Sequence, residues 1–362
     1  MDLGVAGTGI LTGVGTGVEE VWTRLASPAD DGAEPRHRVS AELAVPRRIA
    51  KKTDRFAHLA FASVREAMGV AGRLGAEAAD AGVWWGTSGG GTATLARAFE
   101  SSTAAGPEAM SPWVATAWFP ASAQGWLSIE HQLLGASRTF AAGRVSGAIA
   151  CHMGALAVRA ERNDWALVGG ADAAPPAAHP NPFRPFDIER AGHQVGEGAA
   201  ALVLERPGGR ALGYLLSSAV VAGPPADPQP VERAIRTALR SADLVPDDIA
   251  FVVAEGAGTR AGDRAEAVGI ARVLGRETPV TSTKAAYGHL YGASFPAEVV
   301  LAVESMRRGF LPPLQGVRRP DRDGCPVNVT VAGFDADLPY AVVLSTGDNG
   351  TAVAAVLARD PR

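Results

Sequence analysis

The chain has 362 residues, of which 47% are hydrophobic and 20% charged, and its formal net charge is −4 at pH 7. This is the composition of an ordinary globular protein, with length for two domains or for one large two-part domain. The small negative charge gives no overall basic field and argues against a nucleic-acid-binding protein. The two cysteines, Cys151 and Cys325, are too few for a disulfide framework or a cysteine metal site.

The N-terminal segment MDLGVAGTGILTGVG has no basic region ahead of its apolar residues and is interrupted by glycines, so it does not resemble a signal peptide. The longest uncharged stretch, residues 109–129, contains prolines, serines, a glutamine and a glycine, and would make a poor membrane span. We therefore expect a cytoplasmic protein that does not bind membranes.

Short apolar runs typical of strands alternate with helical stretches along the chain, and this alternation predicts an α/β fold. Glycines and prolines are scattered between these runs as turn residues and do not gather in a linker. The predicted strands lie at 4–11, 81–88, 164–172, 200–205, 212–223, 249–256, 279–284 and 340–346. The predicted helices lie at 53–69, 92–101, 147–160, 231–242, 263–274 and 293–308.

Two of the predicted helices suggest an internal two-fold repeat. Residues 147–160 and 293–308 are both apolar, rich in small residues and preceded by a Gly-rich loop. Helices that are apolar on most sides are buried inside a protein, here between sheets. We therefore expect two similar halves, 1–208 and 209–362, packed as one compact unit.

Local motifs are compatible with a hydrolase function but do not favour it. Residues 86–90, GTSGG, fit the G-x-S-x-G pattern between a strand and a helix, where Ser88 could act with His289 and an aspartate. No HGGG-type oxyanion motif accompanies it, so a simple Gly-rich turn is the preferred interpretation. The sequence has no P-loop, no dinucleotide-binding glycine spacing and no histidine pair spaced for zinc, so we expect no cofactor and no metal.

The segment FAAGRVSGAIACH, residues 140–152, places Arg144 directly before a predicted apolar helix. A nucleophile at such a position gains from the positive end of the helix, but an arginine has no nucleophilic lone pair to offer. Cys151 lies about two turns inside the helix. Buried helical cysteines are usually small core residues, so we do not expect Cys151 to be catalytic.

Several longer motifs resemble the β-ketoacyl synthase family of the thiolase fold, in the family's order and over residues 2 to 358. They are DWALVGGAD (164–172), PFDIERAGHQVGEGAAALVLE (185–205), EGAGTRAGDRAE (255–266) and KAAYGH (284–289). The resemblance implies a thiolase-like layered αβαβα fold built from two pseudo-symmetric halves. Catalytic members of the family use one cysteine and two histidines.

The resemblance also implies that this active site is degenerate. The cysteine position corresponds to Arg144 and the first histidine position to Glu255, whereas the second histidine is retained as His289 together with Lys284. The gating phenylalanine of the C-terminal Gly-rich loop corresponds to Asp348. An arginine forms no thioester, and an ionised glutamate does not donate hydrogen bonds. We hypothesise that Arg144 and Glu255 form a salt bridge in the vacated site.

This pattern resembles the chain-length factors, or KSβ subunits, of type II polyketide synthases, in which glutamine typically replaces the cysteine. The resemblance implies a non-condensing, catalytically degenerate subunit of a β-ketoacyl-acyl-carrier-protein synthase complex. It would form a heterodimer with a catalytic ketosynthase and shape the tunnel that sets product chain length on an acyl carrier protein. Two alternatives remain open: an autonomous thiolase-fold decarboxylase or hydrolase using His289 or Ser88, and a purely structural partner.

The resemblance further assigns residues to the tunnel and to the dimer interface. Thr92, Leu95 and Phe99 share one helix face at spacing i, i+3, i+7, and bulky residues at this place in the family stop the growing chain. The alternative is that this face packs on the chain's own core. Aromatic residues favour an interface over 109–129, unless they too are core. The interface residues expected there are Trp113, Thr116, Trp118, Phe119 and Trp126.

Overall fold

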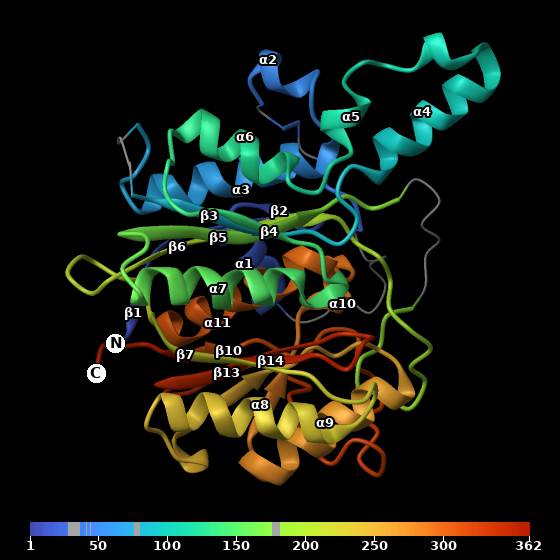
Figure 1. The fold of residues 1–362 in the computed structure, drawn as a ribbon. Helices are drawn as coiled ribbons and strands as arrows, with labels where there is room; N and C mark the ends of the chain where they lie inside the picture. The colour runs from blue at the N-terminus through green and yellow to red at the C-terminus, as the bar shows by residue number, and fades with distance from the viewer. Residues whose placement is uncertain (28–36, 41, 44, 76–79, 176–181) are drawn as a thin grey trace.

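The computed structural model describes residues 1–27, 37–40, 42–43, 45–75, 80–175 and 182–362. Helices and β-structure alternate in five layers: helices on one outer face, β-strands, two central helices, a second layer of strands and helices on the other outer face (Figure 1). This arrangement confirms the predicted layered α/β fold. No helix within the described ranges is long and apolar enough to cross a membrane.

The first half of the chain supplies the upper layers of Figure 1. Its strands are β1 (Leu3–Thr12), β2 (Gly15–Thr16), β3 (Gly82–Gly86), β4 (Arg138–Phe140), β5 (Trp165–Asp172) and β6 (Gly198–Glu205). Its helices are α1 (Val18–Ala26), α2 (Arg47–Ala50), α3 (Arg55–Val70), α4 (Thr92–Ala105), α5 (Val114–Ala117), α6 (Ser122–His131) and α7 (Ser146–Arg159), with 3-10 turns η1 (Pro107–Ala109) and η2 (Gly143–Val145).

The second half supplies the lower layers and the second central helix. Its strands are β7 (Tyr214–Val221), β8 (Phe251–Val253), β9 (Pro279–Thr281), β10 (Phe310–Leu311), β11 (Asn328–Val329), β12 (Phe334–Asp335), β13 (Tyr340–Thr346) and β14 (Ala352–Ala358). Its helices are α8 (Pro228–Ser241), α9 (Arg260–Leu274), α10 (Lys284–Tyr287) and α11 (Ser294–Arg308), with 3-10 turns η3 (Pro246–Asp248) and η4 (Tyr291–Ala293).

The strand order repeats between the halves. It runs β4-β3-β5-β6-β1 in the first half and β9-β8-β13-β14-β7 in the second, so strands that correspond in chain order occupy corresponding places. The two sets join where β1 pairs antiparallel with β7, at Leu3 with Leu215 and Gly4 with Tyr214. The helices α7 and α11 occupy equivalent positions in this repeat, as the apolar pattern predicted.

Every predicted helix and strand overlaps an element of the structure, but several elements were missed, among them α1, α6, β4 and the longer strand β14. Its sequence, AVAAVLA, is rich in alanine, which favours helices when considered alone. In the fold it is fully buried between β13 and β7. Its small side chains suit a strand covered by helices on both faces, and tertiary packing therefore overrides the local preference.

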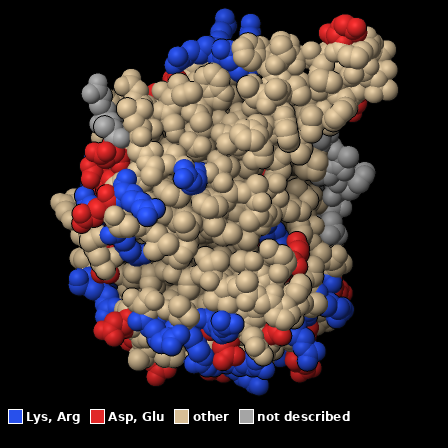
Figure 2. Space-filling view, in the orientation of Figure 1, with Lys and Arg blue, Asp and Glu red and all other residues tan. Residues whose placement is uncertain are grey.

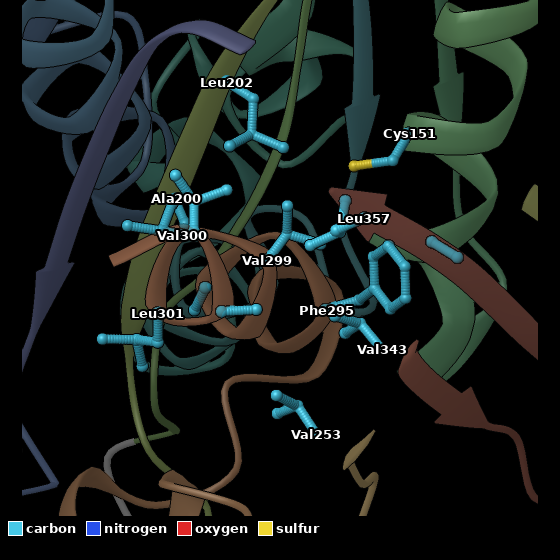
Figure 3. Packing of buried hydrophobic residues seen from close by; sticks show 14 of the residues in the cluster. Cys151, Ala200, Leu202, Val253, Phe295, Val299, Val300, Leu301, Val343 and Leu357 are labelled. Atoms are coloured by element: carbon cyan, nitrogen blue, oxygen red, sulfur yellow. The ribbon is translucent and has the colours of Figure 1, made fainter. Parts of the chain in front are cut away.

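The central helices pack tightly because small residues line them. A Cβ atom at Gly147 in α7 would lie 2.0 Å from the carbonyl oxygen of Gly292 in η4, so only glycine allows this approach. Figure 3 shows Cys151 of α7 pointing among apolar side chains of α11 and of the neighbouring strands, including Phe295 and Val299. Burial raises the pKa of the Cys151 thiol, which fits a core residue and not a nucleophile.

The carboxylate of Asp172, at the end of β5, ties the two halves together. It accepts hydrogen bonds from the Thr87 hydroxyl (2.8 Å), from the backbone N–H groups of Ser88 (2.8 Å) and Gly89 (3.0 Å), and from the N–H of Gly292 (2.8 Å). The first three partners follow β3, whereas Gly292 belongs to the second half. One buried acceptor thus fixes the turn after β3 against η4.

We expect Asp172→Asn to lower the thermal unfolding midpoint. The amide would turn an N–H₂ group toward donors, and each unsatisfied buried group costs about 1–3 kcal/mol. The matched control is Asp164→Asn, whose exposed side chain pairs with Arg206 at the surface. Scanning calorimetry should give a clearly lower midpoint for the first variant only, and equal midpoints would contradict the assigned role.

Candidate functional site

Arg144 lies in η2, immediately before α7, and its side chain is only 6% exposed. Its Nη2 donates to Oδ1 of Asp348 at 2.6 Å, in the loop between β13 and β14, where the aspartate side chain is 85% exposed. The Nε of Arg144 is buried and has no hydrogen-bond acceptor among the residues that the structure describes. The expected salt bridge between Arg144 and Glu255 is therefore wrong: Arg144 pairs with Asp348.

Glu255 is fully buried after β8 and already has partners. Its Oε1 lies 2.5 Å from Nε2 of His289, and its Oε2 accepts a hydrogen bond from the Ser345 hydroxyl at 3.1 Å. These contacts engage both carboxylate oxygens of Glu255, whereas Arg144 pairs with Asp348 in the exposed loop.

The hydrogen bonds around His289 fix its tautomer. The backbone N–H of Tyr291 donates to Nδ1 of His289 at 2.9 Å, so Nδ1 is an acceptor and carries no proton. In a neutral ring the proton then lies on Nε2, which donates it to Glu255. The single N–H of the retained histidine is therefore committed to Glu255 and is not free for a substrate.

The charges of this pair follow from its surroundings. Burial lowers the pKa of His289, in spite of the neighbouring Glu255, and keeps the ring neutral near pH 7. Burial by itself would raise the pKa of Glu255, but its interactions with His289 and with the Lys284 and Arg144 cations hold that pKa at about 2. Glu255 is thus an ionised acceptor within an enclosed site.

Lys284 is retained but faces away from any open space. It is fully buried, and its Nζ donates to Oε1 of Glu298 in α11 at 3.0 Å and to the carbonyl of Ala254 at 3.1 Å. Burial alone would lower the pKa of Lys284, but attraction to Glu298 and Glu255 raises it. The ammonium therefore stays charged and anchors the loop before Glu255.

Two further side chains border the site that the sequence analysis did not single out. His193 Nε2 lies 3.1 Å from the Tyr291 hydroxyl, and the His193 and His289 ring centroids are 5.0 Å apart. Burial lowers the pKa of His193 to about 4, so this ring is neutral as well. His193 lies inside the quoted motif PFDIERAGHQVGEG, where a lone histidine among small and acidic residues was an available signal.

The structure does not bring Ser88 and His289 into a triad. The Ser88 backbone N–H donates to Asp172, and His289 is bonded to Glu255, Tyr291 and Ser294. In the described part of the chain no hydrogen bond joins the Ser88 side chain to a base. The segment after β3 is thus the Gly-rich turn that the preferred interpretation expected. Within the same residues, no cluster of three His, Cys, Asp or Glu side chains could hold a metal ion.

Two family models match consecutive parts of the chain, which together span residues 40–318 except 208–210. They are described as β-ketoacyl synthase, N-terminal domain, over residues 40–207, and β-ketoacyl synthase, C-terminal domain, over residues 211–318. The chain belongs to the β-ketoacyl synthase family. The resemblance found in the sequence motifs is therefore confirmed.

Named relatives of this β-ketoacyl synthase family chain include polyketide synthase subunits. The actinorhodin polyketide β-ketoacyl synthase 2 of Streptomyces coelicolor is 33% identical over 92% of this chain and 88% of its own. The tetracenomycin polyketide synthase ketoacyl synthase beta subunit of Streptomyces glaucescens is 32% identical over 87% and 88%. The solved structure titled the ishigamide ketosynthase/chain length factor matches 99% of both chains with a TM-score of 0.90 and 26% identity.

In this ketosynthase-family chain the helix α4 stands out from the body (Figure 1). Within α4 only Ala98 is buried, whereas Thr92 is exposed, Leu95 is half-buried and Phe99 is 60% exposed. The alternative that Phe99 packs on the chain's own core is therefore wrong. Whether these three residues line a tunnel stays a prediction.

The aromatic residues that follow α4 are also largely at the surface. Trp113, Thr116, Trp118 and Phe119 are exposed, and Trp126 is half-buried. Figure 2 shows few charged side chains over α6 and most of α4, whereas Lys and Arg side chains gather at the top edge near α2, an acidic group lies at the tip beyond α4, and further charged side chains gather lower down over α8 and α9. Contiguous exposed apolar surface on a soluble domain usually marks a contact site. The interpretation of these aromatics as core is wrong for all but Trp126.

We expect Glu255→Gln to be less stable than the wild type near neutral pH, with a gap that closes on acidification. The folded-state pKa of Glu255, about 2, is lower than its ordinary value of 4.5. The ionised carboxylate therefore stabilises the fold above about pH 4.5, and this contribution is lost as pH falls toward the folded pKa.

Urea unfolding midpoints of the two proteins, compared at about pH 7 and at about pH 4, measure this gap. The control is Glu277→Gln, since Glu277 is exposed and its carboxylate forms no hydrogen bond or ion pair with the described residues. That variant should show no gap that changes with pH. A Glu255→Gln gap that widened on acidification would contradict the assignment.

Proposed function

We propose that this chain is a chain-length factor, the non-condensing partner of a catalytic ketosynthase in a type II polyketide synthase. The observation that carries the proposal is the commitment of the His289 Nε2 proton to Glu255, beside an arginine at the nucleophile position. The printed names of relatives, a ketoacyl synthase beta subunit and a ketosynthase/chain length factor, support the same assignment.

The chemistry of the site argues against condensation on this chain. Without a cysteine at residue 144, no thioester forms there, and Cys151 is a buried core thiol. An enolate needs hydrogen-bond donors where its negative charge develops. Here the ring donor of His289 is occupied, and the ionised Glu255 would repel the developing charge.

The surface supports a heterodimer. The strand β4 ends the sheet order and pairs only with β3, so among the described strands its other edge is unpaired. The unpaired backbone groups of an open edge can form hydrogen bonds with a strand of a partner chain. The exposed aromatics at residues 113–119 would supply the apolar contacts that dominate interface energetics. In this proposal the partner accepts acyl groups from an acyl carrier protein, and α4 shapes the far wall of the tunnel.

We expect the wild-type chain to take up no acyl group covalently. The chain and its co-expressed ketosynthase partner are incubated together with acyl carrier protein thioesters, and intact masses of both are measured. The partner's own acyl adduct is the internal positive control. A stoichiometric adduct on this chain would refute the non-catalytic role and favour the autonomous decarboxylase or hydrolase that would use His289 or Ser88.

We expect Phe99→Ala to lengthen the polyketide product by one or more two-carbon units, and Thr92→Phe to shorten it. The Phe99 side chain is exposed in the isolated chain, so its truncation should leave folding intact. The readout is mass spectrometry of carrier-bound products from each heterodimer.

The control for this experiment is Val245→Ala, which truncates an exposed apolar side chain in the other half of the protein. Its product length should equal that of the wild type. An intact heterodimer with unchanged product length in both α4 variants would remove α4 from length control and favour a purely structural partner.

A further inference from the structure

The buried cation of Arg144 is incompletely satisfied. Its side chain is 94% removed from solvent, yet its one ion pair uses a single Nη2–Oδ1 contact to Asp348. Within the described ranges of the chain, the Nε has no acceptor. A guanidinium offers a planar fork of donors that matches a carboxylate bidentately, and a one-point contact leaves much of that capacity unused.

The surroundings of Arg144 favour a further negative charge. Arg144 directly precedes the N-terminus of α7, a helix of 14 residues with no side-chain cap at that end. The positive end of the helix dipole adds to the charge of the guanidinium. Two anions lie nearby. Glu255 forms hydrogen bonds with His289 and Ser345, and Asp348 pairs with Arg144 but belongs to an exposed loop.

We propose that the position beside Arg144, which the Asp348 carboxylate now occupies, is a binding site for the carboxylate group of a small ligand. The ligand carboxylate would displace Asp348 and pair with the guanidinium through two donors. Asp348 acts as an internal competitor that occupies this binding site while no ligand is bound. Because its side chain is 85% exposed, it can return to water without leaving an uncompensated buried charge of its own.

The binding site beside Arg144 suits a carboxylate better than a phosphate. The group that now contacts Arg144 is itself a carboxylate, at 2.6 Å. The buried anion Glu255 stays in the site after Asp348 leaves, and it repels a dianion more strongly than a monoanion. The proposal therefore assigns a monoanionic carboxylate, whatever larger molecule carries it.

The test is a ¹⁹F NMR titration of the purified full-length protein, in the assembly in which it is isolated, with trifluoroacetate as probe at constant ionic strength. We expect saturable line broadening that acetate reverses and that the uncharged analogue acetamide does not. In Arg144→Gln the affinity should fall by about tenfold or more, since the charged fork is lost. Any binding that remains in this variant measures other sites of the assembly.

The second variant, Asp348→Asn, removes the competitor from an exposed loop and should leave folding intact. Tethered groups compete at effective concentrations on the order of millimolar, so probe affinity should rise about threefold or more. Opposite effects of the two variants would support the site. Equal binding in Arg144→Gln and the wild type, or no gain in Asp348→Asn, would overturn it. Displacement of the probe by inorganic phosphate more effectively than by acetate would overturn the carboxylate assignment.

Discussion

The packing of two helices between two layers of strands is the constraint on which the rest of this structure depends. α7 and α11 are covered on both sides, so their sequences must be apolar and small enough for close approach. The contact between Gly147 and Gly292 is possible only without side chains. It brings the start of α7 and η4, from opposite halves of the chain, to one place, and hydrogen bonds of Asp172 fix η4 against the turn after β3. The candidate site lies at this point because Arg144 precedes α7 and His289 precedes α11, and the starts of the two helices meet here.

Once charged groups are enclosed at this point, each must find a partner, and the choice of partner decides the chemistry. Glu255 accepts a hydrogen bond from His289 Nε2, Lys284 donates to Glu298, and Arg144 donates to Asp348 in an exposed loop. A histidine whose only N–H is bonded to a carboxylate cannot donate to a substrate. The N–H of His289 therefore contributes to this internal pairing. Arg144 is left with an Nε that has no acceptor among the described residues.

The outer surface imposes a second constraint. Exposed aromatic side chains after α4 and the unpaired edge of β4 both lie in the first half, away from the charged surface over α8 and α9. Apolar surface and an open strand edge are liabilities for a protein that stays alone. A partner that covers them would relieve both, and Phe99 belongs to this exposed surface and not to the core of the chain.

The sequence by itself determined the family, the alternation of strands and helices, the pair of small-residue helices and the presence of an arginine before the first of them, because these depend on residue type and on periodicity along the chain. It did not determine β14, whose alanines favour a helix until strands on both sides enclose them. Nor did it determine the pairing of the charged side chains: Arg144 and Glu255 have opposite charges, yet Arg144 bonds to Asp348 and Glu255 bonds to His289. Only the tertiary structure decided this. Hydrogen bonds require contact within about 3 Å and a defined direction, and neither can be obtained from residue type or spacing in the chain.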